Sequence, residues 1–280
     1  MLKAGKKYEL EVIKIVDFGL FLDARNLGEV LLPSRYKKKH FKVGDLISVF
    51  LYFDSEDRLI ASTQVPIAAV DEYAYLKVSD VSDFGAFLDW GLDKDLLVPF
   101  AEQYRPMKKG QSYLVYIYLN KFDGRIVASS KIDRFVNEGP HMFTPKQAVN
   151  LIIANTTDLG FKAIINHSHW GVLYKNDIYQ RLSFGQSIKG FIKHIRSDGK
   201  IDLSLHDGNQ NRDKNIQIIE NYLRSENGFV AVHDKSDPEL ILRLFGMSKK
   251  AFKKAVGGLY KSNIIEIESN GIRLIEQEIK

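Results

Sequence analysis

DFGLFL at residues 17–22 returns as DFGAFL at residues 83–88 and, in a weaker form, as DLGFKA at residues 158–163. In each copy a second glycine follows 25 positions after the first, as Gly44 follows Gly19. Each copy then ends on a related phrase, which reads RLIAS, RIVAS or KIDLS. Three markers that keep this spacing three times indicate three copies of one small domain, followed by a tail of different sequence.

Each copy has the pattern of a small β-barrel. In the first copy, apolar runs at residues 8–22, 45–53 and 59–61 are separated by turns rich in Gly and Asp. Short strands between turn signals are typical of a small antiparallel barrel or sandwich, and a copy of roughly 65 residues suits a barrel of five strands. We expect four domains, at residues 1–66, 67–137, 144–208 and 212–280.

A stretch with two Pro and one Gly at residues 137–145 predicts a linker. The first two domains would then form one block and the remainder another.

The glycine of the repeated motif predicts which side chains face outward. Phe18 and Phe21 are three positions apart, so simple alternation along a strand would place them on opposite faces. A glycine in a strand often marks a bulge, which adds one residue. We therefore predict a bulge at Gly19, with Phe18 and Phe21 outside and Leu20 and Leu22 in the core. The same reasoning places Phe84, Phe87, Leu159 and Lys162 outside, and Ala86, Leu88, Phe161 and Ala163 inside.

The repeated pattern Asp-Phe-Gly-x-Phe, with a later glycine and a closing Arg-Ile-x-x-Ser, resembles the RNA-binding domain named after ribosomal protein S1. The resemblance implies an OB fold, a five-stranded Greek-key barrel. It also implies a nucleic-acid face built from two Phe, a His on the third strand, and an Asp and an Arg four residues apart near the last strand.

The resemblance assigns a candidate RNA-binding set to each copy, with departures. The His position falls on Leu32 and Val98 in the first two copies, and Lys121 replaces the Asp in the second. The third copy lacks both Phe, so its site would be more basic and less aromatic. The candidates are Phe18, Phe21, Asp54 and Arg58, then Phe84, Phe87, Lys121 and Arg125, then Lys162, Tyr174, Arg196 and Lys200.

Exposed aromatics beside cations suit a single-stranded nucleic acid. A base stacked on an aromatic ring is worth roughly 1–3 kcal/mol, and every base offers such a face. Arg and Lys neutralise the phosphates between the bases. The alternative is that these Phe fill the core, because Phe is usually buried.

The tail after residue 212 has the pattern of a winged helix-turn-helix. Apolar residues at helical spacing predict helices at residues 213–225, 238–245 and 249–260, and NG at residues 270–271 predicts a hairpin between two further strands. The third helix carries Lys249, Lys250, Lys253 and Lys254 off its apolar face. No Arg, Asn or Gln accompanies these lysines to read base edges, so they favour backbone contact, unless they only solubilise the helix.

Composition limits the remaining classes of function. The chain has a net charge of +5 and no Cys, which excludes disulfides, a thiol nucleophile and Cys-ligated zinc. His167 and His169 supply two ligands where zinc needs at least three, so we expect no metal and no cofactor. The basic run RYKKKH at residues 35–40 fits a phosphate contact or a solvated loop equally well. Without an apolar stretch of the roughly 18 residues that a membrane span needs, or a signal-like N-terminus, we expect a cytoplasmic protein.

The expected architecture is multidomain and mainly β, with three S1-type OB barrels followed by an α+β winged helix. This order of domains resembles the conserved virulence factor B family, an RNA-binding regulatory family. The resemblance implies single-stranded RNA as partner and effects on the expression of other genes. The sequence contains no phosphate-binding Gly-rich loop, G-x-S-x-G or H-E-x-x-H motif, so we expect no catalysis. Two alternatives remain open: a transcription regulator that binds duplex DNA through the winged helix, and a protein-interaction scaffold.

Overall fold

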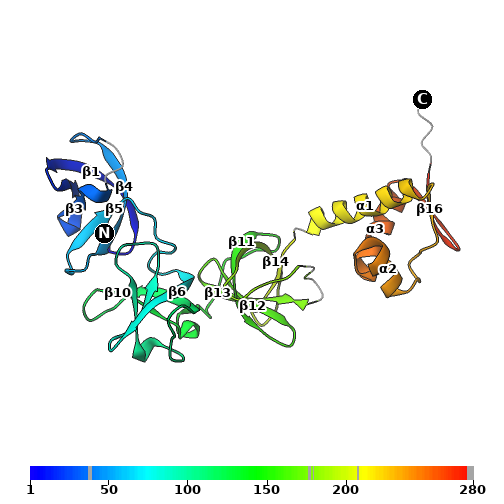
Figure 1. The fold of residues 1–280 in the computed structure, drawn as a ribbon. Coiled ribbons are helices and arrows are strands. Elements are labelled where there is room, and N and C mark those ends of the chain that lie inside the picture. The colour runs from blue at the N-terminus through cyan, green and yellow to red at the C-terminus, as the bar shows by residue number, and fades with distance from the viewer. Residues whose placement is uncertain (37–39, 176–177, 179, 207, 276–280) are drawn as a thin grey trace. The chain divides into compact units, whose positions relative to one another are not determined.

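A computed structural model shows three closed barrels of five strands each, followed by a domain of three helices and a three-stranded sheet (Figure 1). It describes residues 1–36, 40–175, 178, 180–206 and 208–275. Residues 1–143 and 148–203 form one compact unit, and residues 204–280 with the short segment 144–147 form another. The predicted fold class is therefore confirmed.

The first barrel has the strand order β1-β2-β3-β5-β4. Its core is filled by one face of each strand, so Leu20 and Leu22 are fully buried, as predicted. A parallel pair of strands, in which Leu31 lies opposite Ile60, helps to close the barrel. The strands are β1 (Lys7–Val16), β2 (Gly19–Asp23), β3 (Glu29–Pro33), β4 (Leu46–Phe53) and β5 (Leu59–Ser62), with 3-10 turns η1 (Arg25–Leu27) and η2 (Ser34–Tyr36).

The second and third barrels repeat this arrangement. Ala86, Leu88 and Ala163 are fully buried, as predicted, whereas Phe161 is only partly buried, so its placement in the core was wrong. The second barrel contains β6 (Tyr73–Ser82), β7 (Gly85–Asp89), β8 (Leu96–Pro99), η3 (Phe100–Glu102), β9 (Ser112–Leu119), β10 (Ile126–Ser129) and η4 (Ile132–Phe135). The third contains β11 (Ala148–Thr156), β12 (Gly160–Ile165), β13 (His169–Tyr174), β14 (Ser187–Ile195) and β15 (Ile201–Ser204).

The bulge lies in a different strand from the one predicted. The register shifts between Val12 and Lys14 of β1, which leaves Ile13 as the extra residue opposite β2. The first strands of the other barrels carry matching shifts, between residues 78 and 80 and between residues 153 and 155. Phe18 precedes β2 and lies in the turn after β1, so turn geometry and not a bulge at Gly19 turns it outward.

The repeated glycine has another cause, the close approach of a neighbouring strand. A Cβ atom at Gly19 would lie 2.3 Å from the backbone oxygen of Leu32. The equivalent distances are 2.2 Å from Gly85 to the oxygen of Val98 and 1.9 Å from Gly160 to that of Leu173. These distances are far shorter than a van der Waals contact, so each barrel needs a residue without a side chain at this position.

The first two barrels share one hydrophobic core. Trp90 of the second barrel packs edge-on against Phe50 of the first, with 5.8 Å between ring centroids. The third barrel is joined to the second by a smaller cluster that includes Tyr73, Ile152 and Ile164. The prediction that the third domain separates from the first two was therefore wrong, because this cluster joins it to them across the linker.

The C-terminal domain contains the predicted helices and hairpin. Asp237 and Ser248 cap α2 and α3 by accepting hydrogen bonds from the backbone N–H groups of Glu239 and Ala251, at 2.7 and 3.3 Å. The hairpin turn is Ser269–Asn270, one residue earlier than predicted, because Gly271 already pairs with Glu268. The elements are α1 (Gly208–Ser225), β16 (Phe229–Val230), α2 (Pro238–Phe245), α3 (Lys249–Lys261), β17 (Ile265–Glu268) and β18 (Gly271–Leu274).

Within the described residues, no helix combines the length and apolar character needed to cross a membrane.

Candidate nucleic-acid interface

Two pairs of phenylalanines occupy matching surface positions on the first two barrels. Phe18 is 60% exposed and Phe84 is 75% exposed, each in the turn before the second strand of its barrel. Phe21 and Phe87, within β2 and β7, are partly buried. The rings of Phe18 and Phe21 meet edge to face, with centroids 6.3 Å apart. These side chains lie outside the barrel cores, as predicted, and the exposed rings offer flat surfaces on which bases could stack.

The third barrel presents a different surface at the same place. Leu159, the counterpart of Phe18, is 64% exposed but has no ring. Lys162 lies over the ring of Trp170, with 3.8 Å between Nζ and the ring centroid, and also approaches Asp133 at 3.4 Å. Sequence reasoning missed Trp170, although its position beside Lys162 follows from the pairing of β12 with β13. In the third barrel a cation–π pair of Lys162 and Trp170 therefore takes the place of the two adjacent Phe of the other barrels.

In the first barrel Asp54 and Arg58 form a local ion pair. Asp54 is buried, and its Oδ2 accepts hydrogen bonds from Nε and Nη2 of Arg58 at 3.0 and 2.8 Å, while Oδ1 accepts from the backbone N–H groups of Glu56 and Arg58. Burial raises the pKa of Asp54, but the hydrogen bonds from Arg58 and Glu56 outweigh it and hold the pKa below its usual value. The Glu56 carboxylate also contacts Arg58 at 2.8 Å. Arg58 therefore carries a largely compensated charge.

The second barrel differs from the sequence assignment at Lys121. Asn120 donates its backbone N–H to the oxygen of Arg125, as Asp54 does to that of Arg58, so Asn120 is the true counterpart of Asp54. The loop is one residue longer than in the first barrel, which places Lys121 nearer the tip of the loop. Phe122 beside it is 100% exposed and was missed, although an aromatic next to a lysine in a turn is itself a signal of a nucleic-acid contact.

The residues assigned to the His position are not equivalent in the three barrels. Leu32 and Val98, to which the sequence assigned the His position, face the core and are fully buried, so neither side chain reaches the surface. Their true counterpart in the third barrel is Leu173, because Leu32 pairs with Leu20 and Leu173 with Phe161.

In the third barrel Arg196 binds both Tyr174 and Asp202. Its Nε and Nη2 lie 3.0 and 2.9 Å from Oδ1 of Asp202, and Nη2 also donates to the Tyr174 hydroxyl. Lys200 pairs with Asp198 at 2.9 Å. The basic residues predicted here are thus brought together with acidic partners.

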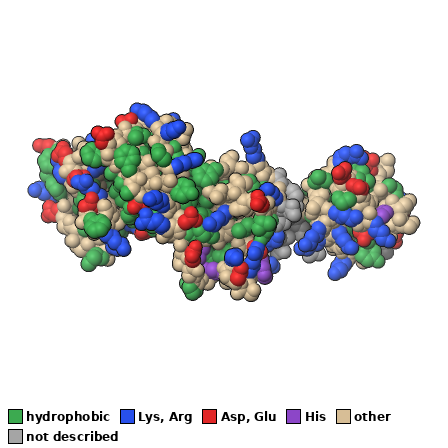
Figure 2. Space-filling model, turned by 90° about the horizontal axis from the view of Figure 1, so that it is seen from below, with side chains coloured by type: hydrophobic (Ala, Val, Ile, Leu, Met, Phe, Trp, Pro, Cys, Tyr) green, Lys and Arg blue, Asp and Glu red, His purple; other side chains and the backbone are tan. Residues whose placement is uncertain are grey.

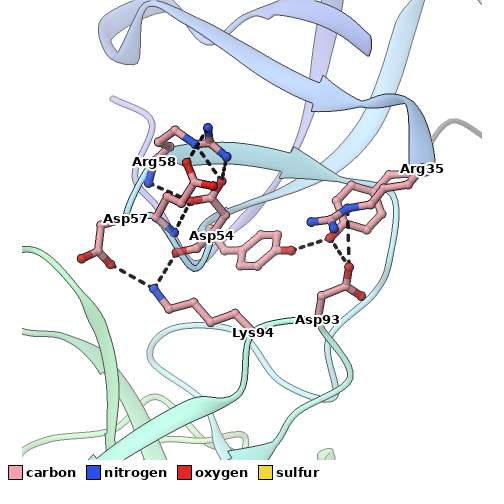
Figure 3. Close-up of polar contacts among 9 residues, drawn as sticks. Arg35, Asp54, Asp57, Arg58, Asp93 and Lys94 are labelled. Atoms are coloured by element: carbon pink, nitrogen blue, oxygen red, sulfur yellow. Dashed lines mark hydrogen bonds and ion pairs between the residues drawn. The ribbon is translucent and has the colours of Figure 1, made fainter. Parts of the chain in front are cut away.

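Asp57 of the first barrel forms ion pairs with Lys94 and Arg125 of the second barrel. Figure 3 shows the contact with Lys94. Lys94 Nζ lies 3.0 Å from Asp57 Oδ1 and donates to the backbone oxygen of Asp54 at 2.6 Å. Arg125 Nη2 lies 2.6 Å from Asp57 Oδ2. The hydrogen bond from Lys94 and the two positive charges lower the pKa of Asp57. Arg125, assigned to phosphate binding, is therefore also part of the contact between barrels.

A second polar contact between these barrels surrounds Asp93. The Tyr36 hydroxyl donates to Asp93 Oδ2 at 2.6 Å and lies 2.8 Å from the Tyr52 hydroxyl. Arg35 Nε approaches the same carboxylate at 3.6 Å (Figure 3). Within the basic run at residues 35–40, Arg35 therefore has an acidic partner. Lys37, Lys38 and Lys39 of that run lie outside the described residues.

His167 and His169, the two histidines considered as metal ligands, lie in separate environments. His167 Nδ1 accepts the backbone N–H of Tyr73 at 2.9 Å, and burial lowers its pKa. His169 packs edge-on against His141, with 5.7 Å between centroids. Among the described residues, no group of three His, Asp or Glu is arranged to hold a metal ion.

The lysines of α3 lie on the surface of the C-terminal domain. Lys250, Lys253 and Lys254 are exposed, Lys249 is partly buried, and Lys253 Nζ lies 3.6 Å from Asp234. On the face seen in Figure 2, Lys and Arg side chains are interspersed with Asp and Glu, here and on the barrels. Mixed charge of this kind predicts moderate electrostatic attraction to a polyanion.

Comparisons with known proteins identify the domains and the family. The S1 domain model matches residues 4–64 and 72–131, and the CvfB-like winged helix domain model matches residues 217–274. Conserved virulence factor B of Staphylococcus aureus is 28% identical over 251 residues, which cover 84% of this chain and 81% of that protein. The uncharacterized protein YitL of Bacillus subtilis (strain 168) is 30% identical over 284 residues, which cover 96% of this chain and 92% of the relative. The chain belongs to the conserved virulence factor B family.

This membership of the conserved virulence factor B family fits the observed order of barrels and winged helix. A multidomain protein with nucleic acid binding domains from Streptococcus pneumoniae TIGR4 is 25% identical and covers 97% of this chain and 98% of its own, with a TM-score of 0.39. S1 and winged helix domains are nucleic-acid-binding classes, so the matches support nucleic acid as the ligand of this member of the conserved virulence factor B family.

Proposed function

We propose that this protein binds single-stranded RNA without catalysing a reaction on it, and so regulates gene expression after transcription. The observation that carries the proposal is the pair of exposed rings, Phe18 and Phe84, at the same position of two adjoining barrels. Each ring has a second Phe two residues beyond the repeated glycine, which gives each barrel room for stacked bases. Aromatic side chains on an OB barrel are the usual platform for single-stranded nucleic acid.

The charges near these rings support a modest electrostatic contribution. Arg58 and Arg125 lie near the last strand of each barrel, but both pair with Asp side chains. An Arg presents five N–H donors, so each guanidinium retains donors for a phosphate while it holds its carboxylate. Affinity should therefore come chiefly from stacking, with a shallower salt dependence than that of a strongly basic protein.

The regulatory part of the proposal draws on the relatives. The name of the staphylococcal relatives, conserved virulence factor B, connects them with virulence, and a non-catalytic RNA binder can influence virulence by controlling which transcripts are used. We propose the cytoplasm as the place of action, since transcripts are available there.

Replacement of the stacking rings tests the function. In the full chain, Phe18→Ala, Phe21→Ala, Phe84→Ala and Phe87→Ala together should weaken binding to a labelled 20-nucleotide RNA by more than about tenfold, measured by fluorescence anisotropy. The matched control is Leu159→Ala, which removes an equally exposed apolar side chain at the same position of the third barrel. Circular dichroism must show that the variant remains folded. Unchanged affinity in the folded quadruple variant would refute the stacking model.

A specific observation keeps duplex DNA as the second candidate ligand. Lys250, Lys253 and Lys254 are exposed along the helix that helix-turn-helix proteins insert into the major groove. The same assay with duplex DNA decides between the candidates. Tighter binding of duplex than of single strands, lost on Lys250→Gln and Lys254→Gln, would favour a transcription regulator. Absence of binding to either ligand would turn attention to a protein partner.

A further inference from the structure

A pocket of about 290 Å³ lies at the junction of the first and second barrels, next to the aromatic pair of the second. Tyr52 and Asp57 contribute from the first barrel, and Phe84, Phe87 and Trp90 from the second. The shared core and the Asp57 contacts hold these residues of the two barrels together.

The size and walls of the pocket suit one flat ring. Its volume lies just below the roughly 300–1,000 Å³ that is typical of small-molecule sites. Phe87 and Leu97 lie directly opposite each other in neighbouring strands and both line the pocket, and Phe84 beside them is exposed to solvent. A base stacked near Phe84 would thus have an apolar cavity within reach. This inference rests on the proposed RNA-binding function.

Polar groups in the lining indicate which base fits. Asp95 accepts a hydrogen bond from the Ser79 hydroxyl at 2.6 Å, and a carboxylate can accept several more. A carboxylate is a partner for the exocyclic amino group of a base, such as N4 of cytosine, and it repels a carbonyl oxygen such as O4 of uracil. Arg125 also lines the pocket, with part of its guanidinium exposed, where it can meet a phosphate.

We propose that this pocket receives one nucleobase with an exocyclic amino group from the bound RNA. The ring enters beside Phe87, the amino group donates to Asp95, and the adjoining phosphate pairs with Arg125. The second barrel, assisted by the first, then selects cytosine over uracil, while the surface rings of the first barrel bind bases of any kind.

Two homopolymers that differ only in the base test the proposal. The full chain should bind r(C)12 about tenfold more tightly than r(U)12 in fluorescence anisotropy at pH 7.5, because one hydrogen bond to a charged group separates them. Asp95→Asn retains an oxygen to accept from Ser79 but offers an amide N–H, which suits O4 of uracil. It should abolish or reverse the preference. Asp89→Asn, at an exposed carboxylate of the same barrel outside the pocket lining, should leave it unchanged.

A second variant tests the cavity without changing charge. Leu97→Phe places a larger side chain in the pocket and should reduce binding of r(C)12 about tenfold, to the level of r(U)12.

The outcomes separate the pocket from the function on which it rests. RNA binding that depends on the four Phe but shows no base preference, or a preference that Asp95→Asn leaves intact, overturns the pocket and leaves the function standing. Binding to neither homopolymer overturns both.

Discussion

Nη2 of Arg125 in the second barrel lies 2.6 Å from Oδ2 of Asp57 in the first. The residue expected to neutralise phosphate is thus already bound to a carboxylate of its neighbour. Lys94 binds the other oxygen of the same carboxylate at 3.0 Å. Asp57 therefore reduces the positive charge that the junction offers to a nucleic acid.

Removal of the Asp57 charge should strengthen RNA binding. Asp57 has a positive φ of 58°, which Asn tolerates well, so Asp57→Asn preserves the turn while it releases Lys94 and Arg125. We expect a several-fold higher affinity and a salt dependence steeper by about 0.7 in log K per log salt for each phosphate gained. Anisotropy titrations at three salt concentrations measure both. Glu268→Gln, which releases Arg273 in the C-terminal domain, makes the same change in net charge and is the control. A slope equal to that of the wild type would contradict this role for Asp57.

Loss of the Asp54 charge should change how the free energy of unfolding depends on pH. The pKa of Asp54 is lower in the folded protein than the value of about 3.9 for an unfolded Asp. Its stabilising contribution is therefore complete at neutral pH and disappears as the pH falls below about 4 towards the folded-state pKa. Asp54→Asn should lower the free energy of unfolding by about 1–3 kcal/mol at pH 7, because it weakens hydrogen bonds to a charged group. When the pH is lowered, the free energy of unfolding of this variant should fall less than that of the wild type. Urea titrations at pH 7 and about pH 3 provide the comparison. Parallel losses in both proteins would refute this prediction.

The close approach of strands at the repeated glycine predicts intolerance of even one methyl group. Gly85→Ala should destabilise the barrels by more than about 1 kcal/mol, because the new Cβ atom would collide with the backbone oxygen of Val98. Gly257→Ala in α3 is the matched control. That position has open space around it, so Ala should stabilise the helix by up to about 1 kcal/mol. Thermal unfolding should give a lower melting temperature for Gly85→Ala and a higher one for Gly257→Ala than for the wild type. Equal changes in melting temperature would show that the close strand contact is not the cause.

Two buried tyrosines should respond in opposite ways to loss of the hydroxyl. The Tyr36 hydroxyl is hydrogen-bonded to Asp93 and Tyr52, so Tyr36→Phe should cost about 1–3 kcal/mol. The Tyr73 hydroxyl is buried without a partner among the described residues. Tyr73→Phe should therefore be neutral or stabilising, because it removes an unsatisfied polar group. Denaturant titrations compare the two, and a large loss of stability in Tyr73→Phe would reveal a partner that this geometry does not show.

Most of the fold followed from the sequence because the repeat carries its own signals. The spacing from Gly19 to its counterpart Gly85 sets the length of one repeat, and the caps Asp237 and Ser248 mark the starts of two helices. The bulge could not be located, because its extra residue, Ile13, is an ordinary strand residue in the facing strand. A glycine that marks a close approach and one that marks a bulge look alike in a sequence.

The candidate site was less predictable, because it depends on contacts between repeats. The outward position of Phe18 and Phe84 was predicted correctly, although the turn before the second strand causes it and not the bulge that the motif suggested. The counterpart of Asp54 was misplaced at Lys121, since a loop of different length breaks alignment by spacing. The contact of Asp57 with Lys94 and Arg125 depends on how two barrels pack, which the sequence of each repeat does not specify.

The core common to the first two barrels has a consequence for fragments of the protein. Trp90 covers Phe50, so a fragment that ended after β5 would expose apolar surface that its neighbour normally hides. Limited proteolysis should therefore release the two barrels joined and never the first by itself. Although the sequence contains three repeats, the first barrel cannot be duplicated in evolution or expressed as a separate domain without new residues that cover Phe50.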